Sequence, residues 1–284
     1  MLAVVLILVA VAVGIWIGND RLGPPFKILR EQEAQFHFID VGQGDAALIR
    51  TAEGNILVDA GTGASEDRLR AYLDNLGIKE IRYAIFSHPD EDHIGGADMI
   101  LREYDVEQVI LPPVKPNTEV FASMMKAAEA SGSEILWATP STTLILGGVT
   151  CSILAPLRTD YEGTNNGGIV LRVDYGNTSA LFMGDAEQVV EEELVAHYGS
   201  AAGGLLDCDL IKVGHHGSDT SSGEAFLQAV TPDYGVISCG AGNPYGHPTP
   251  SVLDAYRTVG ATLYRTDLKG SIVFTSTGEE PIAP

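Results

Sequence analysis

Four short apolar runs of this sequence end in aspartate or histidine residues, and no other sequence feature restricts the fold as strongly. The runs are "NILVDAG" with Asp59, "IRYAIFS" followed by His88, "SALFMGDAE" with Asp185, and "LIKVGHHGS" with His215 and His216. Short apolar runs bounded by glycine and polar residues are typical of buried strands. We therefore expect strands that bring carboxylates and imidazoles together at one edge of a sheet sandwich.

The rest of the chain alternates strand-like and helix-like segments. Strands are predicted at "QFHFID" and "DAALIRT", joined by the turn "VGQG", and at 106–111, 134–137, 143–146, 149–155, 168–175, 178–183, 209–214, 234–238, 261–265 and 271–275. Helical spacing predicts helices at "SEDRLRAYLDNLGI", 95–104, 118–131, 187–198, 223–229 and 250–259. Strand pairs mixed with single helices favour two sheets with helices outside them. We expect one α/β domain over residues 33–284.

The first seventeen residues, "MLAVVLILVAVAVGIWI", contain no charged side chain. A run of this length is near the lower limit for a helix that crosses a bilayer. We predict a transmembrane anchor over residues 1–18 and a linker over residues 19–32; the alternatives are a cleaved signal segment and a buried core element. Arg21, Lys27 and Arg30 follow the run, a weak bias toward a cytoplasmic domain that leaves the side of the membrane open.

The composition argues against a protein that binds nucleic acid through a basic surface. Aspartate and glutamate outnumber lysine and arginine 38 to 17, which gives a formal net charge of -21. A field of this sign repels anionic partners, whereas tight non-specific binding of nucleic acid relies on basic side chains. Cys151, Cys208 and Cys239 are widely spaced and form no CxxC pair, so we expect buried free thiols.

The stretch "SHPDEDHIGG", residues 87–96, predicts half of a metal site. The potential ligands within it are His88, Asp90, Asp92 and His93. Neutral imidazole and carboxylate are ligand types that zinc and manganese accept. We expect a loop that wraps the cation, followed by a close turn that Gly95 and Gly96 permit. The alternative is a solvated turn in which Asp90 or Asp92 caps the next helix.

The motif "HPDEDH" resembles the signature HxHxDH of the metallo-β-lactamase superfamily, with Asp90 in place of the second histidine. The chain is more specifically similar to the ComEC competence-protein branch. The stretches that carry this resemblance, in the same order, are "FHFIDVGQGDAALI", "NILVDAG", "SHPDEDHIGG", "NNGGIVL", "LFMGD", "IKVGHHGS" and "YGHPTPSVL". The resemblance covers roughly residues 35–276 and implies a two-metal hydrolase with an αββα fold, in which two mixed sheets are flanked by helices.

The resemblance also implies a ligand set for two divalent metal ions. It gives His88 and Asp90 for one ion, and Asp92, His93, the bridging carboxylate Asp185 and His215 for the other. Asn166 lies near where the superfamily has another histidine. Asn166 and Asp59 are therefore candidates for the shell of the first ion or for substrate contact. An oxygen-rich shell favours a harder ion, which makes manganese a rival to zinc.

For the reaction, the resemblance implies hydrolysis of DNA with one strand degraded, by a domain on the extracytoplasmic side. Two adjacent cations activate water and hold a phosphodiester. We expect Asp92 to orient the nucleophile and His216 or His247 to protonate the leaving oxygen. The candidates for substrate binding are Lys212 and Ser218, with Arg172 as a second positioned cation.

The chain departs from the branch in two respects. A single apolar segment cannot form the branch's multi-helix membrane channel, so a role in DNA uptake requires a separate channel protein as partner. Thr249 stands where the branch commonly has a second histidine. Two other functions stay open: a small-molecule hydrolase for a lactone, thioester or cyclic phosphodiester, and a non-enzymatic, metal-stabilised interaction module.

Overall fold

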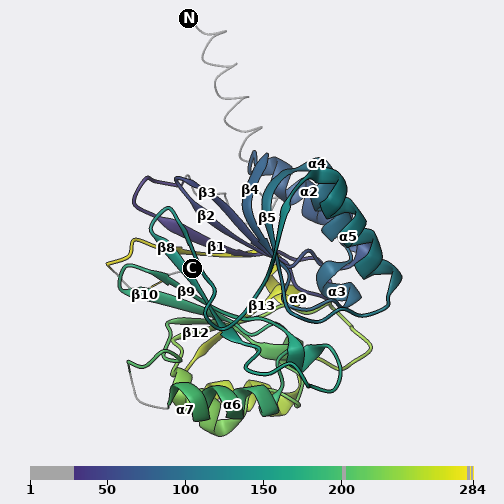
Figure 1. Cartoon of the computed structure of the whole chain (residues 1–284). Helices are drawn as coiled ribbons and strands as arrows, with labels where there is room; N and C mark the ends of the chain where they lie inside the picture. Colours follow the sequence, from purple (N-terminus) through teal and green to yellow (C-terminus); the bar gives the residue numbers. More distant parts are fainter. Residues whose placement is uncertain (1–28, 200–202, 280–281, 283) are drawn as a thin grey trace, which may run out of the picture.

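The computed structural model of the chain describes residues 29–199, 203–279, 282 and 284. Two seven-stranded sheets lie face to face, and helices cover the outer face of each sheet (Figure 1). Over the described residues this four-layer arrangement confirms the expected sandwich of two mixed sheets flanked by helices.

The first sheet has the strand order β14-β1-β2-β3-β4-β5-β6. Its strands are β1 (Ala34–Phe38), β2 (Ala47–Thr51), β3 (Gly54–Val58), β4 (Glu80–Ile85), β5 (Asp105–Leu111), β6 (Glu134–Trp137) and β14 (Ile272–Ser276). Strands β3 to β6 run parallel, whereas β1 pairs antiparallel with both β14 and β2. The helices on its outer face are α2 (Glu66–Asn75), α4 (Ala97–Glu103) and α5 (Glu119–Ser131).

The second sheet has the order β13-β12-β11-β10-β9-β8-β7. Its strands are β7 (Thr143–Leu146), β8 (Val149–Ala155), β9 (Val170–Tyr175), β10 (Thr178–Phe182), β11 (Leu210–Lys212), β12 (Tyr234–Ile237) and β13 (Thr262–Arg265). Strands β10 to β13 run parallel. The helices on its outer face are α6 (Gln188–Tyr198), α7 (Glu224–Val230) and α8 (Pro250–Thr258).

Short helical turns follow several strands. They are η1 (Gly63–Ser65), α3 (Glu91–Ile94), η2 (Asn165–Gly167), η3 (Gly214–Gly217) and α9 (Thr266–Lys269). None of these turns has the length or the periodic apolar face that makes a helix visible in a sequence.

Successive residues of one strand enter different apolar layers, because side chains alternate between the two faces of a sheet. In β3, Ile56 and Val58 pack between the sheets, while Leu57 packs against the helices. Phe38 of β1 stacks on Phe182 of β10 across the interface between the sheets, with 5.7 Å between ring centroids. Both faces of these strands are buried, which explains why the runs are almost continuously apolar.

The longer predicted elements agree with the structure to within a few residues. The strand predicted at 178–183 is β10, Thr178–Phe182, and the helix predicted at 187–198 is α6, Gln188–Tyr198. The three cysteines are free and buried, as expected.

The predicted localisation needs correction. Among the described residues, no helix combines the length and the apolar character that crossing a membrane requires. This finding contradicts the predicted single-pass membrane localisation. The anchor predicted over residues 1–18, its N-terminal apolar helix and most of the linker over 19–32 lie outside the described residues.

Candidate metal centre

The chain that follows β4 supplies the residues of "SHPDEDHIGG". Asp90 has extended backbone at the position before α3, and Asp92 and His93 lie in α3 itself, so a short helix stands where we expected a loop. Gly96 does not form a left-handed turn. A Cβ at Gly96 would lie 2.5 Å from the backbone oxygen of Ala60. The glycine is needed because the helix packs directly against the chain after β3.

The second sheet supplies the remaining residues of the centre. Asp185 follows β10 after Gly184, and His215 and His216 lie in η3 after β11. His215 and His216 both have left-handed backbone, with φ of 47° and 52°. Such a conformation is unfavourable for residues with a Cβ, and here it directs two adjacent imidazoles to different sides of Asp185.

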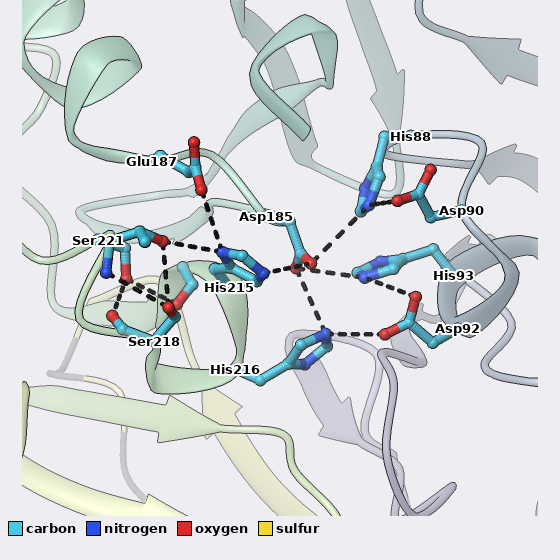
Figure 2. Close-up of polar contacts among 12 residues, drawn as sticks. His88, Asp90, Asp92, His93, Asp185, Glu187, His215, His216, Ser218 and Ser221 are labelled. Atoms are coloured by element: carbon cyan, nitrogen blue, oxygen red, sulfur yellow. Dashed lines mark hydrogen bonds and ion pairs between the residues drawn. The ribbon is translucent and has the colours of Figure 1, made fainter. Parts of the chain in front are cut away.

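Asp185 lies between two groups of side chains (Figure 2). The first group is His88, Asp90 and His215, and the second group is Asp92, His93 and His216. Asp185 Oδ2 lies 3.9 Å from His88 Nε2 and 3.7 Å from His215 Nε2. Asp185 Oδ1 lies 3.2 Å from His93 Nε2 and 3.5 Å from His216 Nε2. One carboxylate therefore faces both groups, as a ligand that bridges two ions would.

The second group is the tighter of the two. His216 Nε2 lies 3.2 Å from Asp92 Oδ2, and His93 Nε2 lies 4.0 Å from Asp92 Oδ1. With Asp185, these residues bring four ligand-type atoms within 4.8 Å of one another. In the first group, His88 Nε2 lies 3.8 Å from Asp90 Oδ2.

The donor atoms fit a metal ion. Among the described residues, the Nε2 atoms of His88, His93 and His216 and Oδ1 of Asp185 are buried without a hydrogen-bond partner. Buried polar atoms are normally paired, so several unpaired atoms directed at one place indicate a site for a cation. Imidazole and carboxylate suit zinc, manganese or iron, and the donor set alone does not select one of them.

The electrostatics of the centre also favour a cation. Burial opposes a positive charge on His93 and His216. The carboxylate of Asp185 outweighs this effect for both rings, with help from Asp59 beside His93 and from Asp45 beside His216. Both pKa values are therefore well above the usual value for histidine. Burial lowers the pKa of His88, and His93 lowers it further, so the His88 imidazole is neutral. The site thus attracts positive charge, which either protons or metal ions can supply.

Each imidazole is oriented by a group behind it. His93 Nδ1 lies 2.9 Å from Asp59 Oδ2, and His216 Nδ1 donates to the backbone oxygen of Ser238 at 2.9 Å. The other two imidazoles have hydroxyl partners: Ser87 Oγ lies 3.1 Å from His88 Nδ1, and Thr220 Oγ1 lies 3.0 Å from His215 Nδ1. Such partners fix the ring and leave Nε2 for the ion.

The hydrogen bonds of Asp59 are those of a support behind His93. Its carboxylate accepts hydrogen bonds from the backbone N–H and the hydroxyl of Ser87, at 2.6 Å and 2.7 Å, as well as from His93. These contacts favour a supporting role behind His93 over the expected place in the first metal shell or in substrate contact.

Asn166 also lies outside the first group. Its amide nitrogen donates to Glu187 Oε2 at 2.9 Å, and its amide oxygen accepts from the backbone N–H of Glu187 at 3.1 Å. Both ends of the amide are occupied. Glu187 in turn lies 3.6 Å from His215 Nδ1, so Glu187 connects Asn166 to the centre.

The assignment of the two adjacent histidines changes as well. We expected His215 to join the second group and His216 to act as a general acid. His216 instead belongs to the second group, and both of its ring nitrogens are directed at fixed partners. His215 faces the first group, on the same oxygen of Asp185 as His88.

The two predicted substrate-binding residues are not available to a substrate. Lys212 is 4% exposed, donates to the backbone oxygen of Val213 and lies 2.7 Å from Asp45 Oδ2. Ser218 is buried, and its hydroxyl accepts hydrogen bonds from Thr220, which holds His215. Arg172 is bound to Asp174 and to the backbone oxygens of Leu205 and Asp207.

Asp45 is the main residue that the sequence analysis missed. It is buried, and Asp45 Oδ1 lies 3.3 Å from His216 Nδ1. The only sequence signal was a carboxylate directly after the turn "VGQG". Asp45, Asp59 and His93 also bring ligand-type atoms together. The ammonium of Lys212 already neutralises Asp45, which argues against a further metal ion there.

His247 lies at the rim of the first group. Its ring centroid is 5.8 Å from that of His215, and its side chain is partly exposed. Partial burial lowers its pKa, and the neighbouring His215 and His216 lower it further. His247 is thus the histidine beside the centre with a position suited to a substrate.

A model of the metallo-beta-lactamase superfamily matches residues 39–241. The chain belongs to the metallo-beta-lactamase superfamily. Among relatives, ComE operon protein 3 of Bacillus subtilis is 29% identical over 85% of this chain and 33% of its own length. Competence protein ComA of Neisseria gonorrhoeae is 34% identical over 86% of this chain and 32% of its own length. These relatives confirm the predicted ComEC-like branch of the superfamily.

The chain spans about a third of the length of these curated relatives. Among solved structures, the metallo-beta-lactamase fold protein YhfI of Bacillus subtilis superimposes with a TM-score of 0.58. It is 13% identical, and the match covers 86% of this chain and all of YhfI. At this identity the similarity supports the superfamily fold and says nothing of the reaction.

Proposed function

We propose that this chain is a dinuclear metal-dependent phosphodiesterase that cleaves DNA, with its hydrolase domain over residues 33–284. The observation that carries the proposal is Asp185, whose two oxygens face two separate groups of imidazole and carboxylate side chains. Metallo-beta-lactamase relatives named for competence support a nucleic acid as the substrate.

The residues of the chain take different parts in this reaction. Two divalent cations, zinc or manganese, would be held by the two groups and would activate water and neutralise charge on a phosphoryl oxygen. Asp92, partly exposed between His93 and His216, orients the water for attack. His247, at the rim beside His215, contacts the phosphodiester.

A second candidate is a small-molecule hydrolase that acts on a lactone, thioester or cyclic phosphodiester. Among the described residues, no lysine or arginine forms an ion pair with Asp90, Asp92 or Asp185. A net charge of -21 repels a polyanion, whereas a neutral ester meets no such repulsion.

The experiment compares substrates on the purified chain after metal removal and addition of manganese or zinc. The substrates are single-stranded DNA, bis-p-nitrophenyl phosphate, an acyl-homoserine lactone and a thioester. Asp92→Asn tests the centre, and Asp254→Asn, on the exposed face of α8, is the matched control. Metal-dependent cleavage of both phosphodiesters, lost only in Asp92→Asn, supports the proposal. Cleavage of the lactone or thioester alone would favour the second candidate.

A further inference from the structure

The loop before α8 holds one aromatic ring in solvent beside the candidate metal centre. Tyr245 is 66% exposed, and among the described residues it is the one aromatic side chain with such exposure. A large ring left in solvent does not contribute the hydrophobic stabilisation that its burial would give. A single exposed ring is not by itself a binding site, so the residues around Tyr245 must show whether it has a function.

Tyr245 is the outer member of a row of rings that leads to the first group. Its ring is stacked on His247, with 5.7 Å between centroids and 25° between planes. His247 meets His215 edge to face at 5.8 Å. His215 Nε2 then lies 3.7 Å from Asp185 Oδ2. One face of the Tyr245 ring is therefore packed on the row, and the exposed remainder is open to a ligand.

The backbone under this row is fixed by hydrogen bonds. The side chain of Asn243 accepts from the backbone N–H groups of Tyr245 and His247, at 3.2 Å and 3.0 Å, and donates to the backbone oxygen of His247 at 2.6 Å. The N–H of Thr249 donates to the backbone oxygen of Gly217 in η3 at 2.9 Å. The loop is thus tied to the turn that carries His215 and His216, so little ordering is needed when a ligand binds.

The charged side chains that interact with the histidines of the row are mainly acidic. Asp219 acts electrostatically on His247, and Glu187 lies 3.6 Å from His215. Lys212 is buried and paired with Asp45. A ligand that binds here alongside an anionic backbone therefore needs an interaction that does not depend on charge. Stacking of a nucleobase on an aromatic ring meets this requirement, and every base has a face to offer.

We propose that Tyr245 is a stacking platform for an unpaired nucleobase adjacent to the phosphodiester that is cleaved. This inference rests on the proposed phosphodiesterase function and adds a preference for single strands. Bases of a duplex are already stacked on one another and paired, so they reach the ring only after strand separation. Binding through a ring also depends less on salt than binding through basic side chains.

The test compares Tyr245→Ala with Tyr245→Phe, which keeps the ring. Leu268→Ala, at a 70% exposed apolar side chain of α9, is the matched control. On a single-stranded oligonucleotide, kcat/KM falls about tenfold in Tyr245→Ala and stays near wild type in Tyr245→Phe and Leu268→Ala. On duplex DNA and on bis-p-nitrophenyl phosphate the loss in Tyr245→Ala is smaller.

A second readout does not require cleavage. In an Asp92→Asn background, an oligonucleotide that contains 2-aminopurine is expected to lose fluorescence on binding when residue 245 is Tyr or Phe, but not when it is Ala. If wild type cleaves single-stranded DNA and Tyr245→Ala does so equally well with equal quenching, the platform is overturned while the proposed function stands. If wild type cleaves no phosphodiester at all, the proposed function fails, and quenching that depends on Tyr245 would still support base binding.

Discussion

The ammonium nitrogen of Lys212 lies 2.7 Å from Asp45 Oδ2, and both side chains are almost completely buried. Asp45 Oδ1 lies 3.3 Å from His216 Nδ1, on the side of the ring away from Asp185. The lysine therefore acts inside the protein, where it neutralises a carboxylate that supports a ligand of the candidate centre.

Replacing this lysine is expected to destabilise the fold strongly. Lys212→Met leaves Asp45 buried without its partner, and removal of one member of a buried ion pair costs about 3–5 kcal/mol. The double variant Asp45→Asn/Lys212→Met removes both charges and should lose less than the sum of the two single variants. Urea unfolding of the four proteins measures the coupling. Additive losses would contradict a direct interaction between the two side chains.

The support behind His93 is expected to control metal affinity. Asp59→Asn weakens the acceptor for His93 Nδ1–H, and loss of such a partner lowers metal affinity about 10–100-fold. The matched control is Asp209→Asn. Asp209 directly precedes β11, at the end of the strand opposite to His216, and accepts the backbone N–H of Ser179 in β10. Competition with a fluorescent chelator measures both variants. Equal metal affinities of Asp59→Asn and wild type would show that Asp59 does not support the centre.

The left-handed backbone of His215 predicts a stability difference between two variants that both lose the imidazole. His215→Gly accepts φ of 47° without strain, whereas His215→Ala keeps a Cβ in that conformation. The glycine variant should therefore be more stable by about 1 kcal/mol. Thermal or urea unfolding of the metal-free proteins gives the comparison. An alanine variant of equal or greater stability would mean that this turn carries no strain.

His37 is expected to make the fold sensitive to acid. Burial, reinforced by the charge of Arg50, lowers the pKa of His37 to about 3, and the neutral ring contacts Tyr72 Oη at 2.9 Å. The unfolded chain takes up this proton near pH 6.5 and the folded chain only near pH 3. The free energy of unfolding therefore falls as the pH drops below 6.5, by about 1.4 kcal/mol per pH unit from this group.

The control for this effect is His37→Gln, which removes the titrating group. Urea unfolding of both proteins at several pH values between 7 and 5 separates His37 from every other group that titrates. A shallower pH dependence in His37→Gln is expected. Parallel curves would show that His37 does not carry the effect.

The sequence predicts the elements of this fold well because most strands are buried on both faces. Short apolar runs that end in glycine or aspartate are unambiguous, as the agreement for β10 illustrates. The residues of the metal centre follow from the same runs, since the ends of parallel strands meet at one edge. Short turns such as α3 were missed because four residues carry no period.

The roles of neighbouring residues depend on geometry that the sequence does not carry. Which of His215 and His216 faces which group is decided by two left-handed residues in η3. Lys212 resembles a substrate contact until the fold brings Asp45 beside it from a distant part of the chain. Asn166 resembles a ligand until its amide is found on Glu187.

The ligands of the candidate centre are divided between the two halves of the sandwich. His88, Asp90, Asp92 and His93 follow a strand of the first sheet, whereas Asp185, His215 and His216 follow strands of the second. An ion bound by residues from both sheets would work as a reversible cross-link, comparable to a disulfide that joins distant parts of a chain. Ions bound there would add a cross-link to the apolar layer that already joins the two sheets, and their removal would make separation of the sheets easier.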